Sequence, residues 1–401
     1  MSFSSSPRPV NAADAADTPG TERSTKVVIA PDAFKGTASA QQAAQWLGEG
    51  VREVIKDADI YLAPMADGGE GTSELFAGER ITLPTTDAAG RLTEASYTYD
   101  ASTATAFIDV AAASGLPAVA DSPVPLTGDT YGTGVLIADA QTRGASRIAL
   151  GLGGSATIDG GTGILVALGA NPIDARGYQL KPGGGALRDI ADLDTAKVNI
   201  PAGAVDWLLL VDVAAPATGE QGAAAVFGPQ KGASEEDVRV LDAGLAKLCD
   251  VAGVDPATPG MGAAGGVGIG LTWLSTLLHG DASHVQIVPG ARMVADANGL
   301  AEQLADAALV ITGEGRFDSQ TAAGKVAATI FDLVEEHNPD AVVAVAAGNF
   351  EDSPRDVAGS EVIAVTLPDP AEEGEAGIAG QLRRAGAEIA VAYLCTSTVQ
   401  G

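Results

Sequence analysis

The chain has 401 residues, a length that suggests two domains or one large one. It carries 52 acidic and 23 basic side chains, and the resulting net charge of −29 argues strongly against non-specific binding to nucleic acid or to an anionic membrane. Apolar residues make up 46% of the chain and aromatic residues only 4%, so its cores must be aliphatic. The excess of acid fits either solubility or adaptation to salt.

Cysteine usage and hydropathy predict a soluble cytoplasmic protein. Cys249 and Cys395 form no metal-ligand pattern and fit a reducing compartment. No run approaches the ~20 apolar residues that a membrane span needs. Residues 1–24 lack the apolar core of a signal peptide and are rich in Ser, Pro, Ala and Asp, so we expect a flexible tail there.

The chain after this tail begins as a β–α–β unit. The run KVVIAP from Lys26 is short, β-branched and ended by proline, which is typical of a buried strand. Ser39 and Gln42 form a capping-box pattern at the start of an amphipathic helix. Residues 59–65 read as the next strand, so the unit favours a parallel sheet.

Further elements follow in chain order. The pattern predicts a hairpin over residues 93–110, helices over 130–142 and 164–168, and a helix capped by Ser234, together with strands at 147–150 and 207–211. Strands and helices then alternate again, with strands at 307–312, 341–347 and 362–365 and helices at 325–336 and 376–393. Because the two ends of the chain share this alternation, we expect an α/β fold of two domains. One is a discontinuous Rossmann-like domain (residues 25–72 and 286–401), and the other is inserted into it (residues 73–285).

Two glycine-rich segments near the start carry charge directly after a strand. In APDAFKG, Asp32 and Lys35 precede a helix, so Lys35 is placed to bind phosphate; the alternative is an ordinary turn with a solvated lysine. In PMADGGEGT, Asp67 and Glu70 flank two glycines, which suits Mg²⁺ or a substrate hydroxyl. An Asp-Gly turn is the alternative there.

A third segment, GLGGSATIDGGTG, follows the strand at 147–150. Gly151, Gly153 and Ala156 satisfy a loose GxGxxA, with Asp174 at about the distance that a dinucleotide fingerprint requires. The glycines continue to Gly163, however, so the long helix of that fingerprint does not start promptly. A nest of backbone N–H groups for phosphate or carboxylate fits better.

The fourth segment, ITGEGRFDSQTAAGK, gathers Glu314, Arg316, Asp318 and Lys325 in one loop after a strand and at the next helix start. Opposite charges around several glycines favour a functional loop over a solvated one. GPQKGAS adds Lys231, and the run GAAGGVGIG offers another backbone nest.

Motifs that are missing narrow the chemistry. The sequence has no GxxxxGK[ST] of P-loop NTPases and no HRD or DFG of protein kinases. Its three histidines, His279, His284 and His337, lie outside the glycine-rich segments, which argues against a histidine-based triad or zinc site. An aspartate is therefore the expected general base, which suffices in phosphoryl transfer.

Eight ordered segments, from about residue 26 to 348, resemble those of the bacterial-type (class I) glycerate kinases. They are APDAFKGTASA, PMADGGEGT, AAASGLP, YGTG, GLGGSATIDGG, VFGPQKGAS, GAAGG and ITGEGRFDSQTAAGK. The resemblance implies ATP, Mg²⁺ and D-glycerate as reactants, with a phosphoglycerate, usually 2-phosphoglycerate, as product. It also implies two α/β domains with the active site in the cleft between them. We expect a monomer or homodimer.

The same resemblance, read motif by motif, suggests which residues form the site. Asp67 or Asp212 would accept the hydroxyl proton, and Lys35 and Arg316 would neutralise the transferred charge. Glu70, Glu314 or Asp318 would hold Mg²⁺. The remaining residues would bind substrate or nucleotide: Asp32, Gly68, Gly69, Gly153, Gly154, Ser155, Thr157, Asp159, Lys231, Gly265, Gly266 and Lys325.

Two positions depart from the family pattern. The family usually reads SATND where this chain has Ile158 before Asp159, and DV-x-NP where this chain has Ala215 before Pro216. Two amides that could hold substrate are therefore lost, and an unpaired hydrogen-bonding site can cost one to a few kcal/mol. This leaves three alternatives open: a kinase for another hydroxy acid, a small-acid or nucleotide sensor, and an oxidoreductase that uses residues 151–156.

Overall fold

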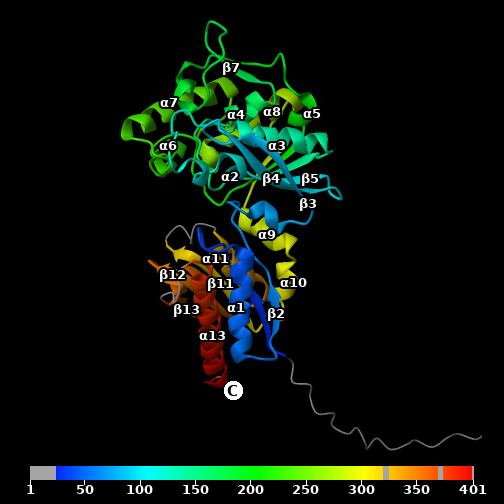
Figure 1. The fold of residues 1–401 in the computed structure, drawn as a ribbon, viewed down its shortest axis with the longest axis vertical. Helices are drawn as coiled ribbons and strands as arrows, with labels where there is room; N and C mark the ends of the chain where they lie inside the picture. The colour runs from blue at the N-terminus through cyan, green and yellow to red at the C-terminus, as the bar shows by residue number, and fades with distance from the viewer. Residues whose placement is uncertain (1–23, 319–324, 369–373, 400–401) are drawn as a thin grey trace, which may run out of the picture.

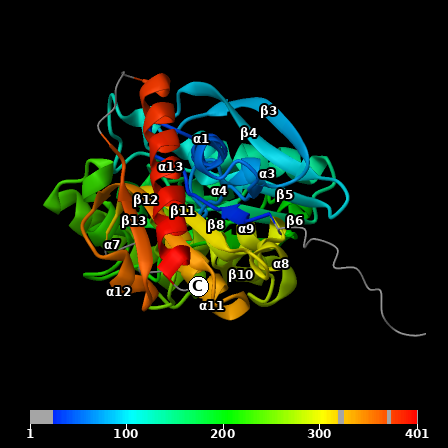
Figure 2. The ribbon, with the colours of Figure 1, turned by 90° about the horizontal axis from the view of Figure 1, so that it is seen from below.

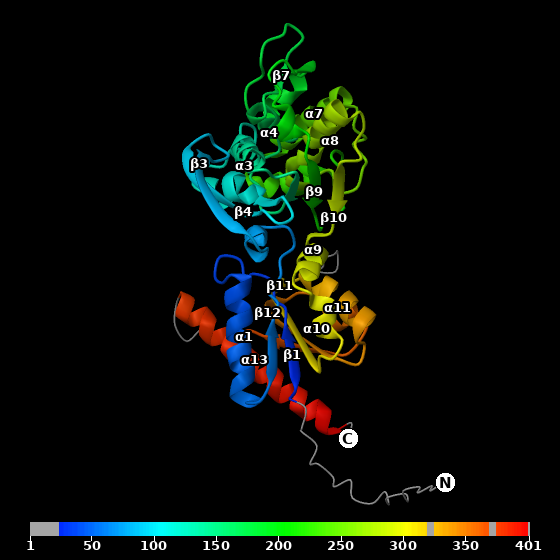
Figure 3. The same cartoon turned by 90° about the vertical axis from the view of Figure 1, so that its right-hand side faces the viewer.

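The computed structural model describes residues 24–318, 325–368 and 374–399 (Figure 1). The flexible tail expected over residues 1–24 lies outside the described residues except for Ser24, and so does part of the fourth glycine-rich segment. Two large β-sheets, each with its own helices, follow one another along the long axis of the molecule (Figures 1 and 3).

A five-stranded parallel sheet in the order β13-β12-β11-β1-β2 is built from the two ends of the described chain. Its elements are β1 (Lys26–Ile29), α1 (Ala40–Val54), β2 (Asp59–Leu62), α9 (Gly290–Ala297), α10 (Leu300–Leu304), β11 (Leu309–Phe317), α11 (Val326–His337), β12 (Val342–Phe350), α12 (Pro354–Ala358), β13 (Val362–Thr366) and α13 (Glu375–Val399). Alternate residues of the strands point to opposite faces, so both faces must be covered.

The helices divide between these two faces. Val27 and Ile29 pack with α1 and α13 on one face, where the two helices lie side by side (Figure 2). Val28 packs with α9, α10 and α11 on the other face. The predicted β–α–β start is therefore confirmed, and so is its cap. The Ser39 hydroxyl accepts from the Gln42 N–H, while the Gln42 side chain accepts from the Ser39 N–H.

A six-stranded mixed sheet in the order β10-β9-β6-β5-β4-β3 forms the other half. Its strands and larger helices are β3 (Glu79–Thr86), β4 (Leu92–Asp100), β5 (Thr105–Asp109), α2 (Val110–Ser114), α3 (Tyr131–Thr142), β6 (Arg147–Gly151), α4 (Thr162–Ala167), α5 (Ile200–Gly203), β9 (Asp206–Leu210), α6 (Ala223–Phe227), α7 (Glu235–Ala252), α8 (Val267–His279) and β10 (Val285–Val288). A small hairpin and five 3₁₀ turns complete it: β7 (Asn171–Ile173), β8 (Asp192–Asp194), η1 (Thr72–Leu75), η2 (Pro117–Val119), η3 (Gly184–Asp189), η4 (Pro229–Lys231) and η5 (Ala263–Gly265).

Strand pairing confirms the expected hairpin and the mainly parallel character of the fold. β4 pairs with β5 antiparallel, whereas β5, β6, β9 and β10 are parallel neighbours. One face carries an aliphatic core with α3, α4, α7 and α8, in which Trp207 is fully buried. The predicted α/β class is confirmed.

The other face of the six-stranded sheet shares a core with the five-stranded sheet. Phe107 and Leu210 from the one sheet cluster with Val28 from the other and with Met65 in the loop after β2. Phe76, directly after η1, stacks on Phe107 with ring centroids 3.9 Å apart. This common core fixes the loops of the two sheets against each other.

The division into a discontinuous domain and an inserted one stays a proposal. Sheet membership favours placing its second boundary after Val288, because β10 pairs with β9 in the six-stranded sheet. Across the described ranges, none of the helices combines the length and the apolar character needed to cross a membrane.

Candidate active site

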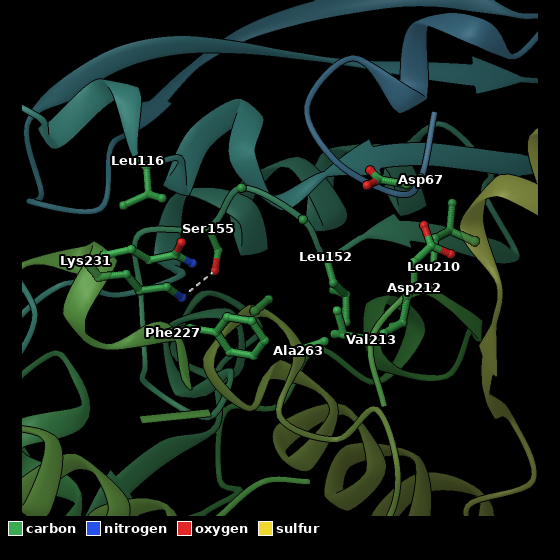
Figure 4. Close-up of a pocket in the computed structure, with 15 residues that line it drawn as sticks. Asp67, Leu116, Leu152, Ser155, Leu210, Asp212, Val213, Phe227, Lys231 and Ala263 are labelled. Atoms are coloured by element: carbon green, nitrogen blue, oxygen red, sulfur yellow. Dashed lines mark hydrogen bonds between the residues drawn. The ribbon is translucent and has the colours of Figure 1, made fainter. Parts of the chain in front are cut away.

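A pocket lies where the loop after β2 meets the loops after β6 and β9 (Figure 4). The carboxyl ends of parallel strands share one edge of a sheet, so the loops after β6 and β9 gather there, and the loop after β2 reaches them from the five-stranded sheet. The pocket is lined by Asp67, Leu116, Leu152, Gly153, Gly154, Ser155, Leu210, Val211, Asp212, Val213, Phe227, Gln230, Lys231, Ala263 and Ala264.

Backbone packing between glycines holds these loops together. Gly68 has a φ of +92°, and a Cβ there would lie 2.7 Å from the Leu210 carbonyl oxygen. A Cβ on Gly153 would lie 2.6 Å from the Gly69 Cα atom, and the Gly153 N–H donates to the Gly68 carbonyl at 2.9 Å. Side chains at these two positions would force the loops apart, so Gly68 and Gly153 are explained by close approach of backbone to backbone. A Cβ on Gly69 would instead lie 2.9 Å from the Asp67 Oδ1.

Two of the acids at or near the pocket have a raised pKa. Burial, followed by the charge of Asp67, raises the pKa of Asp212 to about 8. The same two causes raise the pKa of Asp32 to about 7, with Glu314 adding to the effect and Lys35 opposing it. The structure therefore brings four predicted acids, Asp32, Asp67, Asp212 and Glu314, into one electrostatic cluster.

Asp212 has the free acceptor that proton transfer requires. Its Oδ1 accepts from the Gly290 N–H at 3.0 Å, while its Oδ2 is buried with no hydrogen-bond partner among the residues that the structure describes. Asp67 is held in a similar way, because its Oδ1 accepts from the Gly69 N–H at 3.0 Å. Both side chains line the pocket on the same side (Figure 4).

The third glycine-rich segment supplies the opposite side of the pocket. Lys231 is 4% exposed, and its Nζ donates to the Ser155 Oγ at 2.9 Å and to the Thr157 carbonyl at 2.8 Å. Gly154 and Ser155 face the same space. The Thr157 Oγ1 is buried without a partner.

Asp159, predicted to bind a ligand, is instead enclosed by protein donors. It is fully buried, and its carboxylate accepts from the Thr130 N–H and hydroxyl and from the N–H groups of Gly161 and Gly163, at 2.8–3.1 Å. The geometry favours a structural role, in which Asp159 holds the start of α4. Gly265 also has a packing explanation, because a Cβ there would lie 2.1 Å from the Thr157 carbonyl oxygen. Gly266 is buried at the start of α8 with a φ of +88°.

The fourth segment differs from its predicted form. Strand β11 continues to Phe317, so Glu314 and Arg316 lie on a strand and not in a loop. The reason is that β12 is equally long and pairs Glu314 with Ala347 and Arg316 with Asn349. Lys325 is the N-cap residue of α11, and residues 319–324 lie outside the described chain.

Arg316 of this segment pairs with two acids. Arg316, with 60% of its side chain exposed, has its NH2 atom 2.6 Å from Glu351 and its Nε 3.4 Å from Asp318. Lys35 and Glu70 are exposed on the preceding loops. Among the residues that the structure describes, no three His, Cys, Asp or Glu side chains are arranged to hold a metal ion. Glu70, Glu314 and Asp318 therefore remain individual candidates for Mg²⁺ and do not form a three-ligand centre.

One buried acid near the pocket is not predicted from the sequence. Asp109, at the end of β5, accepts from the Gly71 N–H at 3.1 Å, the Ser73 N–H at 3.0 Å and the Ser73 hydroxyl at 2.9 Å. Burial raises its pKa to about 7, opposed by the bonds from Ser73. Asp109 thus ties the loop that bears Asp67 to the six-stranded sheet. The only sequence signal was an acid ending an apolar strand.

The two departures from the family pattern lie away from the pocket. Ile158 is fully buried in the apolar core of the six-stranded half, so its side chain faces that core. Ala215 is half-buried, and its carbonyl accepts from the Gly262 N–H at 2.9 Å. Neither residue lines the pocket.

Fold and site together define a class of protein. Acids and lysines on glycine-rich loops at strand ends, without a P-loop, are typical of an α/β phosphotransferase. The long helix of a dinucleotide fingerprint does not follow Gly151, since α4 begins only at Thr162 and ends at Ala167.

Comparison with known proteins identifies the family. The model of the glycerate kinase family matches residues 27–392. A glycerate kinase from Halalkalibacterium halodurans is 41% identical over 309 residues, which cover 75% of this chain and 79% of the relative. A glycerate 2-kinase from Escherichia coli is 39% identical over 339 residues, which cover 82% of this chain and 86% of the relative.

A solved structure agrees. The crystal structure of a protein described as glycerate kinase 2 from Salmonella typhimurium superposes with a TM-score of 0.75 at 35% identity, covering 94% of this chain and all of the other. The chain belongs to the glycerate kinase family. The predicted enzyme class, a kinase, is confirmed with it, and ATP use follows from membership of that class.

Proposed function

We propose that the protein transfers the γ-phosphoryl group of ATP to a hydroxyl of D-glycerate, giving 2-phosphoglycerate. The observation that carries the proposal is the pocket itself, where Asp67 and Asp212 face Lys231 and Ser155 (Figure 4). The choice of glycerate as acceptor rests on the relatives of this chain that are named glycerate kinase and glycerate 2-kinase. Ile158 and Ala215 lie outside the pocket, which weakens the case for a changed acceptor.

Asp212 is the proposed general base. It lines the pocket and has an oxygen without a partner, so the acceptor hydroxyl can donate to it. Its pKa of about 8 places it near the range in which a base is both available and strong enough to take a proton. As the oxygen of the hydroxyl attacks phosphorus, its proton passes to Asp212 Oδ2, and ADP leaves.

Mg²⁺ fits the acids at the ends of two neighbouring strands. Asp32 follows β1 and Glu314 lies on β11, both are buried, and the charge of Glu314 acts on Asp32. In phosphoryl-transfer enzymes Mg²⁺ needs only one or two carboxylates besides phosphate oxygens and water. Bound there, the ion would neutralise negative charge on the phosphates. Asp32 and Glu314 would hold it.

Cations near the ends of β1 and β11 suit the phosphate chain. Lys35 follows β1, and Lys325 lies at the start of α11, where the helix N-terminus also favours an anion. Arg316 would have to exchange Glu351 or Asp318 for a phosphate oxygen. Phosphoryl transfer depends mainly on such positioning and charge neutralisation.

A coupled assay of ADP release with Mg-ATP and D-glycerate tests the proposal, and ³¹P and ¹H NMR of the product separates 2- from 3-phosphoglycerate. We expect ADP and 2-phosphoglycerate in equal amounts. If ADP is released with another hydroxy acid but not with D-glycerate, that acid replaces D-glycerate as the proposed acceptor. Binding of D-glycerate or ATP without turnover would support a sensor, and no ADP across a panel of hydroxy acids would refute the kinase proposal.

A further inference from the structure

Lys231 is a buried cation that has no charged partner at hydrogen-bonding distance within the described part of the chain. It ends η4 in the wall of the pocket, and its two acceptors, the Ser155 hydroxyl and the Thr157 carbonyl, are both neutral. A buried ammonium group normally requires an anion beside it, because the charge has lost its water. The pocket is therefore short of one negative charge at this position.

Asp159 does not supply that charge. Its field favours the charged form of Lys231, but its carboxylate is already engaged by Thr130, Gly161 and Gly163. Burial outweighs this field and lowers the pKa of Lys231 to about 7. Phe227, which lines the pocket beside Lys231, is uncharged. An anion that enters the pocket would complete the pairing.

The polarity of the pocket indicates which anion this is. Figure 4 shows Lys231 and Ser155 on one side and Asp67 and Asp212 on the other, with Leu152 and Phe227 between them. A small hydroxy acid carries the matching groups in the same order: a carboxylate, a short carbon chain and a hydroxyl.

We propose that Lys231 and Ser155 bind the carboxylate group of the hydroxy acid, which directs its hydroxyl group towards Asp212. This rests on the proposed function and assigns one end of the acceptor within it. The Lys231 ammonium and the Ser155 hydroxyl both donate to the carboxylate, and a charge-assisted bond of this kind is about twice as strong as a neutral one.

The phosphates of ATP are a poorer match for this position. A triphosphate carries several negative charges, whereas Lys231 offers a single cation whose hydrogen-bond companions are neutral. Lys35, Arg316 and Lys325 belong to the loops and strand ends of the five-stranded sheet and supply several charges there. Binding of phosphate at Lys231 is the competing outcome of the test below.

Proton uptake follows from the proposal. Above about pH 7, part of the free enzyme holds Lys231 in its neutral form. A bound carboxylate stabilises the ammonium and raises its pKa, so binding takes up a proton from solvent. The affinity for the acid should consequently fall as pH rises above about 7.

The test compares Lys231→Met with Lys247→Met, the same change at an exposed lysine on α7. Steady-state kinetics should show KM for D-glycerate raised at least about 30-fold in Lys231→Met and KM for ATP within about twofold of wild type. Calorimetry of D-glycerate binding near pH 8, in two buffers of different ionisation enthalpy, should show proton uptake by wild type and Lys247→Met but not by Lys231→Met. Glycerol, which lacks the carboxylate, should bind wild type and Lys231→Met equally weakly.

Opposite results would overturn the proposal. A raised KM for ATP with an unchanged KM for D-glycerate would assign Lys231 to phosphate, and binding of D-glycerate to wild type without proton uptake would refute the carboxylate pairing. If Lys231→Met does not fold, Ser155→Ala must raise KM for D-glycerate several-fold and retain proton uptake, or the proposal fails.

If wild type turns over no D-glycerate, the proposed function fails. The carboxylate proposal then depends on calorimetry with other small hydroxy acids, and it fails if none of them binds with proton uptake.

Discussion

Asp212 is the side chain on which the proposed proton transfer depends. Its pKa is raised to about 8, first by burial and then by Asp67, and it must lose its proton before it can accept one. Loss of this proton should raise kcat/KM, whereas loss of the Lys231 proton above about pH 7 should lower it, so the profile should rise with deprotonation of Asp212 and fall as Lys231 becomes neutral. Asp212→Asn should lower kcat/KM at least about 100-fold, or about 2.7 kcal/mol, because the variant has no base.

The shape of the pH profile separates a base from a purely structural residue. Initial rates at low D-glycerate, plotted against pH, should lack the rise due to deprotonation of Asp212 (the Asp212 limb) in Asp212→Asn. Asp212→Glu should recover part of this rise. Excess Mg²⁺ should move the limb of wild type to lower pH, since a nearby cation favours the carboxylate. An Asn variant that keeps the wild-type rate, or the wild-type limb, would remove Asp212 from proton transfer.

At the scale of single residues, the sequence identified the charged residues of the site better than it identified the groups that surround them. Asp32, Asp67 and Asp212 were named from their motifs, and the structure places them in one cluster. Asp159 had an equally suggestive position, but four protein donors occupy it. Asp109 was missed, because hydrogen bonds to a loop some 36 residues away leave no local pattern.

Helices α1 and α13 pack through glycines, which gives a prediction at the level of elements. A Cβ on Gly50 would lie 1.9 Å from the Arg383 carbonyl oxygen, and a Cβ on Gly386 would lie 2.2 Å from the Leu47 carbonyl oxygen. Backbone atoms cannot move aside as a side chain can. Gly50→Ala and Gly386→Ala should each lower the free energy of unfolding by about 1–3 kcal/mol.

Gly380 provides the matched control for this prediction. It lies on α13, and a Cβ there would meet no atom of the described residues within 4 Å. Since alanine favours a helix over glycine by about 1 kcal/mol, Gly380→Ala should leave stability unchanged or raise it. Urea unfolding of all three variants checks this. Equal stabilities would show that the helices do not depend on this close contact.

Elements with strong local signals were predicted well, and those that depend on partners were not. The capping box at Ser39 was readable because both of its bonds are local. Strand β10 (Val285–Val288) was missed, since it is short, no more than half-buried, and exists through pairing with β9. Helix α8 begins inside a glycine run read only as a nest. Gly270 belongs there because a Cβ would lie 2.9 Å from the Gly160 carbonyl oxygen.

For the whole molecule, the position of the site follows from the shared core. The cluster that contains Phe76, Phe107 and Met65 joins both sheets, so the loops that carry Asp67 and Asp212 are fixed relative to each other. Sequence motifs identified these loops, but their meeting point depends on packing between segments that lie far apart in the chain.

The net charge of −29 also acts on the whole molecule, through repulsion among the excess acids. Added NaCl should raise the thermal unfolding midpoint, because screening weakens this repulsion more than it weakens surface ion pairs worth at most about 1 kcal/mol each. If the charge serves only solubility, the rise should be nearly complete by about 0.2 M, where the Debye length is already below ~8 Å. Adaptation to salt predicts a continued rise towards molar NaCl. Melting curves at increasing NaCl separate the two, and a midpoint that falls on addition of salt would contradict both, since it would mean that attraction between opposite charges outweighs the repulsion.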